Sequence, residues 1–506
     1  MRFSTVRWMM LVLLCLSVIL LGAGCKPKAK VVPDVKGKTL AQATAAIEAA
    51  GYTVGETKED YDATVPAGQV AFQVPAAGTA AEKGTPVDLT VSLGPKADST
   101  TYDVTYAPET VVVDEAHLGL MTDSDPENHV YTFDAAGVAA AGLPLEEGRP
   151  LIIHGVAARR ISAVTENGGN LVVETEYMTL NEAITDGTIA WDYGVEFTPE
   201  KIAAIEVPGH GRVVPKAATP VEFSFDIGEY NYEIKCTLDN TVATYDFIIS
   251  KGLVSTAAAK LEAAGKLERF RSKDSITFAG GEPQEFGHEL DAMRGDLTVS
   301  LTVAASGNDA VNLELPATIM YIPFMVGLVP VELKVKVQFV VNAVVPLGAS
   351  ARVSSKFSYD STLGFNFDGA GATAAASAGN VNFGDSTHET GAPNHIAANF
   401  GLGFPRVELD IFKESVVPWA QTAFLVGGTY TFQPACQTAD AMFIGAAGYE
   451  LGLFGWVHLA SGKITLFQEK KPLLRSGDCP ADKETVESFL VENALAGYGL
   501  EQDVDR

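Results

Sequence analysis

The chain has 506 residues, enough for about two to four domains, and 47% of them are hydrophobic. Its 63 acidic and 36 basic side chains give a formal charge of −27, and a surface of this sign disfavours binding to DNA or RNA. Five cysteines are too few to brace a chain of this length, so a disulfide-rich scaffold is excluded.

Residues 1–24 have the layout of a secretory signal peptide. Two arginines supply a positive start, residues 8–21 are apolar and uncharged, and small residues up to Gly24 precede Cys25. This junction resembles the signal of bacterial lipoproteins, in which the bond before a cysteine is cleaved and the cysteine is acylated. The resemblance implies cleavage between Gly24 and Cys25 and a lipid such as palmitate on Cys25. Plain secretion and an uncleaved anchor are the alternatives.

Residues 25–30 would then form a short lipidated tether. Lys26 and Lys28 lie in it, and basic side chains at a membrane surface favour anionic lipid head groups. The membrane would be a partner of the protein through the lipid on Cys25. We therefore expect an extracytoplasmic protein of the cell envelope, at the periplasmic face or at the cell surface.

Residues 31–95 predict a small α+β module. Thr39 and Gln42 form a T-x-x-Q capping box, which satisfies free amide groups at the start of a helix. Apolar residues recur at helical spacing from Leu40 to Ala50, and Gly51 supplies the left-handed residue that ends a helix. Turn signals separate three expected strands, at 52–56, 69–73 and 87–93.

The same stretch resembles a PASTA domain, the module named after penicillin-binding proteins and serine/threonine kinases. The matching segments are "VPDVKGKTL", "AAGY", "VPAGQV", "QVPAAGT", "KGT" and "VDLTVSLGP", in the order of the family. The motif residues are Pro33, Gly37, Gly51, Gly68, Pro75, Gly78 and Gly84. The resemblance implies binding rather than catalysis. Some family members are associated with peptidoglycan fragments or β-lactam-like ligands, and others act as spacers or protein contacts.

After a linker at 96–104, the chain predicts two β-rich domains, at 105–252 and 273–478. Apolar and polar residues alternate with period two in several stretches, which is typical of half-buried antiparallel strands. These stretches are 221–227, 245–250, 296–303 and 331–339. The expected fold class is mainly β, with the small α+β module at the N-terminus. We expect the body to be an antiparallel β-sandwich-like structure or an open β-barrel.

Several segments break the strand pattern. The spacing of leucines and alanines predicts a helical connector at 253–272, and residues 479–506 predict a C-terminal helix and tail. Thr179 and Glu182 form a second capping box, which should open a short helix. The apolar run 319–333 contains two prolines and is short for a membrane-spanning helix, so a buried strand pair is expected. An apolar surface for a ligand or partner is the alternative.

The sequence contains no recognisable catalytic motif. Neither a G-x-S-x-G elbow nor H-E-x-x-H occurs, and His288 and Glu289 lack a second histidine nearby. Asp123, Asp125 and Glu127 are weak calcium candidates, because their oxygens cluster but their spacing lacks the full EF-hand pattern. No other metal site and no cofactor is expected.

The cysteines of the body allow one disulfide. Cys436 and Cys479 both lie in polar, turn-like contexts, and in an exported protein they would pair and leave Cys236 alone. Three separate reduced cysteines are the alternative.

These patterns favour a membrane-anchored, non-enzymatic lipoprotein of the bacterial cell envelope. Its single PASTA-like module would contact peptidoglycan fragments or an envelope protein, and the β-rich body would be a scaffold or interaction surface. Two alternatives stay open. One is a cell-wall hydrolase that the module targets to its substrate, and the other is a carrier of lipid or of a partner protein.

Overall fold

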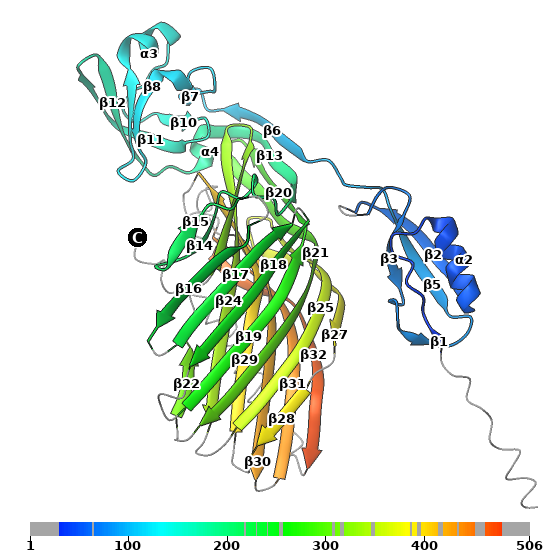
Figure 1. The fold of residues 1–506 in the computed structure, drawn as a ribbon. Helices are drawn as coiled ribbons and strands as arrows, with labels where there is room; N and C mark the ends of the chain where they lie inside the picture. Colours follow the sequence, from blue (N-terminus) through cyan, green and yellow to red (C-terminus); the bar gives the residue numbers. More distant parts are fainter. Residues whose placement is uncertain are drawn as a thin grey trace, which may run out of the picture. The chain divides into compact units, whose positions relative to one another are not determined.

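The computed structural model describes residues 30–477 apart from short gaps (Figure 1). The gaps are residues 63–64, 217–218, 229, 240, 252–256, 306–308, 314–317, 346–349, 385–386, 392–395, 413–417, 433–434 and 451–460. Cys25, the signal sequence and the predicted C-terminal helix at 479–506 lie outside the described residues. The chain divides into two compact units, Met1–Lys96 and Ala97–Arg506. Across the described ranges, no helix is long and apolar enough to cross a membrane.

The first unit packs one helix on a three-stranded sheet. Its elements are β1 (Lys30–Val31), α2 (Leu40–Ala50), β2 (Thr53–Asp60), β3 (Val70–Val74), β4 (Ala80–Ala81) and β5 (Pro86–Ser92). The sheet has the order β2-β5-β3, in which β2 runs parallel and β3 antiparallel to β5, while β1 pairs with β4. This is the α+β module that the sequence predicts.

Helix α2 begins and ends where the sequence predicts. The Gln42 amide donates to Thr39 Oγ1 (3.4 Å) and the Thr39 amide donates to Gln42 Oε1 (3.1 Å), so both halves of the capping box are present. Gly51 ends the helix in the left-handed conformation. The residues that the helix buries are Ala43 and Ile47. Leu40, which shares their periodicity, is 39% exposed in the first turn.

The second unit contains a small sheet with a core of its own. In sheet order its strands are β7 (Val111–Val113), β10 (Pro150–Ile153), β11 (Ala157–Asn167), β12 (Asn170–Glu176), β9 (Val130–Asp134) and β8 (Met121–Asp125). A short 3-10 turn, η1 (Leu118–Leu120), precedes β8, and α3 (Ala135–Ala141) follows β9. Phe133, Leu151 and Val173 are buried in this core.

A large sheet of twelve described strands runs through the body (Figure 1). Its main path is β16 (Val221–Ile227), β17 (Tyr230–Asp239), β18 (Val242–Lys251), β19 (Ala257–Glu268), β21 (Glu282–Ala305), β20 (Phe270–Ala279), β13 (Ile184–Val195) and β6 (Ser99–Tyr106). The long strand β25 (Ser350–Phe367) pairs with β21, and it also carries β26 (Ala372–Ala374), β27 (Ser377–Phe383) and β28 (Thr387–Gly391). The helix predicted after Thr179 is α4 (Leu180–Ala183), and its capping box is present.

The other large sheet has nine described strands. Its order is β15 (Gly211–Val213), β14 (Ala204–Val207), β23 (Thr318–Val326), β24 (Val329–Val345), β29 (Ile396–Ile411), β30 (Trp419–Phe432), β31 (Ala435–Glu450) and β32 (Ser461–Gly477). Strand β22 (Asp309–Leu313) pairs with β24. The apolar run 319–333 forms the hairpin of β23 and β24, so the predicted buried strand pair is confirmed.

One apolar core joins the two large sheets. Tyr245 of β18 meets Phe404 of β29 edge to face, with ring centroids 5.3 Å apart. Phe357 of β25 meets Phe424 of β30 at 4.9 Å. Alternate side chains of both sheets therefore face each other, as in a β-sandwich. The mainly β fold class with an N-terminal α+β module is confirmed.

The predicted helical connector at 253–272 is wrong. Strand β19 lies in this segment and pairs along one edge with β18 and along the other with β21. Its side chains alternate as strand residues do, with Leu261, Ala263 and Leu267 buried. Backbone hydrogen bonds to a neighbouring strand on each side outweigh the helix preference of this alanine-rich segment. The segment joins strands of one sheet and does not separate two domains.

Candidate functional site: the N-terminal module and a charged sheet face

The motif glycines of the first unit shape its backbone. Gly37, Gly51, Gly68, Gly78 and Gly84 all have φ between +76° and +89°. At Gly51 this conformation returns the backbone amide to carbonyl groups of the last helical turn. These glycines therefore shape the turns of the module.

Gln73 of β3 ties the two motif prolines together. Its Nε2 donates to the carbonyl oxygens of Pro33 (2.9 Å) and Pro75 (3.2 Å). Its Oε1 accepts from the Val35 amide (2.9 Å), and the side chain is buried. Three hydrogen bonds on one buried amide fix the segment before α2 against the end of β3. Sequence reasoning missed Gln73, whose one signal is a polar residue within an otherwise apolar strand.

Several apolar side chains of the module remain accessible. Leu40, Val74 and Tyr61 are 39%, 44% and 52% exposed, although the core of the module closes around Ile47 and Leu89. Apolar and aromatic surfaces make van der Waals contacts with sugar rings and with peptide side chains. Each of these three side chains is therefore available for contact with a ligand or a partner.

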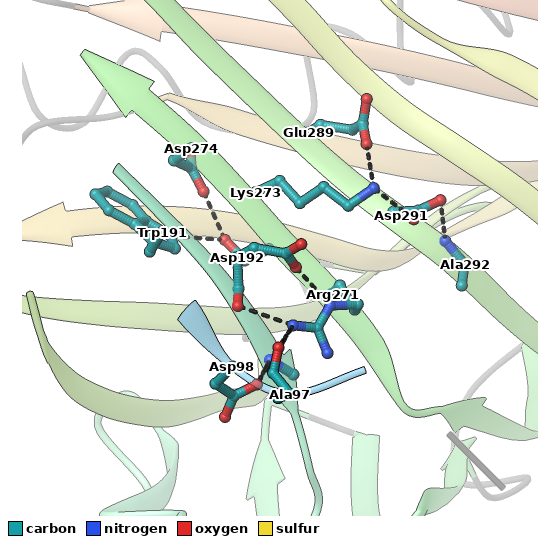
Figure 2. A network of polar contacts seen from close by, with 12 residues as sticks. Ala97, Asp98, Trp191, Asp192, Arg271, Lys273, Asp274, Glu289, Asp291 and Ala292 are labelled. Carbon is teal, nitrogen blue, oxygen red and sulfur yellow. Dashed lines mark hydrogen bonds and ion pairs between the residues drawn. The ribbon is translucent and has the colours of Figure 1, made fainter. Parts of the chain in front are cut away.

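In the body, Arg271 of β20 organises one edge of the large sheet (Figure 2). Its Nε donates to Asp192 Oδ1 (2.5 Å) and its Nη2 donates to the Asp192 carbonyl oxygen (2.8 Å). The same Nη2 contacts Asp98 Oδ1 (3.4 Å) and the Ala97 carbonyl oxygen (3.2 Å). One guanidinium group therefore holds the segment before β6 against β13. A lysine side chain could not make the same set of contacts, because it lacks the planar arrangement of N–H donors.

Lys273 lies two residues further along β20, between two carboxylates of β21 (Figure 2). Its Nζ donates to Glu289 Oε1 (2.9 Å) and to Asp291 Oδ2 (2.6 Å). Partial burial opposes the charge of the ammonium group, but the two carboxylates more than offset this and raise the pKa of Lys273. Lys273 is therefore a charged structural link between β20 and β21.

On the opposite, core-facing side of the same strands lies a chain of polar groups. Trp191 Nε1 donates to Ser272 Oγ (3.3 Å), and Ser272 Oγ donates to Asp274 Oδ2 (2.6 Å). Asp274 Oδ1 lies 2.5 Å from His288 Nδ1. Ser272 bonds to the aspartate and not to the histidine, so it is not held as a nucleophile by a histidine base. Because Asp274 and His288 have no exposed side-chain surface, this series of hydrogen-bonded groups is part of the core.

Of the calcium candidates, Asp123 and Asp125 lie in β8 and Glu127 lies in the turn that follows it. Asp125 accepts hydrogen bonds from the Asn128 amide (3.1 Å) and from Asn128 Nδ2 (2.8 Å), and these bonds lower the pKa of Asp125. Asp123 accepts from the Ser124 amide (2.9 Å), and Glu127 is exposed. The Asp125 carboxylate thus stabilises the turn, and the Asp123 carboxylate bonds to the backbone of β8. Of the residues the structure describes, no three His, Cys, Asp or Glu side chains are grouped as a metal site requires.

The cysteine predictions fall largely outside the described residues. Cys479 is not described, and Cys436 lies in β31 with its side chain likewise undescribed, so their disulfide stays a prediction. Cys236 of β17 is a free, buried thiol, and burial raises its pKa to about 12.

Comparisons with known proteins bear on the first unit. Residues 30–93 match the PASTA domain model, and no family model matches the remainder of the chain. The chain is also similar to the extracellular region of the Ser/Thr kinase PrkC from Staphylococcus aureus. That likeness has 11% sequence identity and a TM-score of 0.16, and covers 43% of this chain and 95% of that chain. A TM-score of this size supports no inference about the body. Residues 30–93 of this protein form a PASTA domain.

Proposed function

We propose that the protein is a lipid-anchored component of the bacterial cell envelope whose PASTA domain binds peptidoglycan fragments outside the cytoplasm. The observation that carries this proposal is the match of residues 30–93 to the PASTA domain. The domain has a buried core of its own and is a compact unit distinct from the body, which suits an independent binding module. In this proposal the β-rich body is a non-catalytic scaffold or interaction surface.

The proposed anchor is an acyl group on Cys25. Because the PASTA domain begins at residue 30, only five residues would join it to the lipid, a reach of about 18 Å when fully extended. The domain would therefore meet cell-wall material close to its membrane. Metabolic labelling with a fatty-acid analogue should mark the wild-type protein and leave Cys25→Ser unmarked. Equal labelling of both proteins, or of neither, would remove the anchor from the proposal.

The binding claim has a calorimetric test. Residues 25–506 carrying Cys25→Ser, which lack both the apolar signal segment and the lipid, are titrated with soluble muropeptides released from purified peptidoglycan by a muramidase. We expect saturable heat with one binding event per PASTA domain, and its loss when residues 30–93 are deleted. Heat that survives the deletion unchanged would assign the binding to another part of the chain.

A further inference from the structure

A groove on the outer face of the twelve-stranded sheet forms a second candidate site. It has a volume of about 380 Å³ and crosses β6, β13, β20, β21 and β25. Pockets that hold small ligands begin at about 300 Å³, so the groove has room for one small molecule. All of its lining residues belong to the second unit, which makes it a different site from the PASTA domain.

The strand register explains why the outer surface of the sheet has a groove at this place. Five residues lie on one rung across the five strands: Thr101, Ala190, Ser275, Gly287 and Asn366. Ala190 and Gly287 fill almost no space above the sheet. A Cβ atom at Gly287 would lie 3.1 Å from Asn366 Oδ1 and 3.2 Å from Ser275 Oγ. The bare backbone at Gly287 is therefore the floor of the groove, with a hydroxyl on one side and an amide on the other.

The uncharged polar side chains of the groove have unused hydrogen-bonding capacity. Within the part of the chain that the structure describes, no protein hydrogen bond engages the side chains of Ser99, Thr101, Ser275 or Asn366. All four are exposed. Each hydroxyl can donate and accept, and the Asn366 amide offers both functions. Several such groups converging on one hollow match a ligand that itself carries several hydroxyl groups.

The charged side chains at the groove are already engaged. Lys273 is held by Glu289 and Asp291, and Asp192 holds Arg271 (Figure 2). Two carboxylates face the single ammonium group of Lys273, so an anionic ligand would meet net repulsion there. A neutral ligand avoids this repulsion and leaves the existing ion pairs intact.

We propose that this groove binds a neutral saccharide of one or two rings. The hydroxyls and the amide would bond to the sugar hydroxyls, and the floor at Gly287 would admit the ring close to the sheet. The proposal does not depend on the PASTA domain. Two sources could supply the same chemistry, namely a free sugar and a glycan fragment of the cell wall.

Saturation-transfer NMR on residues 25–506 carrying Cys25→Ser tests the proposal. The probes are N-acetylglucosamine as the free sugar, a disaccharide of cell-wall glycan whose lactyl carboxyl group is capped as a neutral methylamide, as the stem peptide caps it in the wall, and glucuronic acid as the anionic control. We expect signal from at least one neutral probe, with affinity at least tenfold higher than for glucuronic acid. The neutral probe that gives the stronger signal identifies the source.

Two leucine variants separate the groove from the rest of the sheet face. Gly287→Leu fills the floor and should weaken binding at least tenfold. Thr277→Leu adds the same side chain on the outward face of β20, outside the groove, and should leave binding unchanged. If Gly287→Leu fails to fold, as judged by thermal unfolding, Asn366→Ala replaces it and should weaken binding at least threefold.

Either of two results would overturn the proposal. Either neutral probes give no saturation transfer with the wild-type groove, or the signal is the same in the variant that alters it. A parallel measurement on a chain without residues 30–93 should retain the groove signal. Failure of the groove is thus distinguishable from failure of the PASTA domain to bind muropeptides.

Discussion

His288 Nδ1 lies 2.5 Å from Asp274 Oδ1 on neighbouring strands of the large sheet, and neither side chain has exposed surface. Asp274 also accepts a hydrogen bond from Ser272 Oγ (2.6 Å), which leaves it with two partners in the core. Burial of a polar or charged group costs several kcal/mol unless a partner offsets the loss of water. The two residues therefore depend on each other, and neither is expected to be replaceable alone.

Removal of one member of this pair should destabilise the body. Asp274→Leu leaves His288 without its carboxylate, and we expect the free energy of unfolding to fall by about 3–5 kcal/mol. The double variant Asp274→Leu/His288→Leu leaves no unpaired imidazole, and only the Ser272 hydroxyl loses its acceptor, so it should recover much of that loss. Urea unfolding of both single variants and the double variant gives the coupling energy. Additive losses would show that the two side chains are not coupled.

The lowered pKa of the buried Glu408 carboxylate should make the free energy of unfolding depend on pH. Burial alone would raise its pKa, but Arg406 (2.7 Å) and Lys336 (2.5 Å) outweigh burial and lower it. A lowered folded-state pKa stabilises the fold above the unfolded-state pKa, and this contribution is lost as the pH falls through the folded-state value.

Glu408→Gln should therefore cost about 3–5 kcal/mol at pH 7, since it leaves two cations facing a neutral amide. The difference in unfolding free energy between wild type and variant should shrink as the pH is lowered below the ordinary range of a glutamate. Denaturant unfolding at stepped pH values measures this difference. A gap that stays constant down to the acid limit of folding would contradict the assignment.

The buried thiol of Cys236 should be unreactive in the native protein. Its pKa of about 12 leaves almost no thiolate at pH 8, and burial blocks access of the reagent. In a chain with serine at the other cysteines, we expect alkylation by iodoacetamide to be about a hundredfold slower in buffer than in denaturant. Mass spectrometry follows the reaction. Rapid labelling of the native chain would show that β17 opens readily.

The exposed apolar side chains of the PASTA domain should contribute to ligand binding. Leu40 and Val74 are accessible in a module whose core is otherwise closed, so their replacement has little effect on folding. We expect Leu40→Ser/Val74→Ser to weaken muropeptide binding about tenfold, which corresponds to ~1.4 kcal/mol. Glu48→Gln, an exposed change on the same helix, is the matched control. Unchanged affinity in the double variant would move the contact surface elsewhere on the domain.

Local signals made the PASTA domain predictable. The capping box of Thr39 and Gln42 and the left-handed Gly51 lie within one short segment, and each specifies its own backbone conformation. Period-two alternation likewise located β16 and the core of β24 from a few neighbouring residues. Such local signals set the conformation of a short segment independently of how the rest of the chain folds.

Features that depend on distant pairing were not predictable. Segment 253–272 looks helical by itself and becomes a strand because β18 and β21 both pair with it. The groove needs Thr101, Ala190, Ser275, Gly287 and Asn366 on one rung, and no local pattern sets that register. The polar pair Asp274 and His288 carried one faint signal, since Asp274 alternates with apolar residues on the inward side of β20.

Cosedimentation with purified, insoluble peptidoglycan tests the central claim most directly. Two chains are compared, one with and one without residues 30–93. Both begin at residue 25 and carry Cys25→Ser, so that neither the signal segment nor the lipid remains, and both carry Gly287→Leu to fill the groove. We predict that the chain with the PASTA domain enters the pellet with the peptidoglycan and that the chain without it stays in the supernatant. Equal recovery of both chains in the pellet, or of neither, would contradict the account.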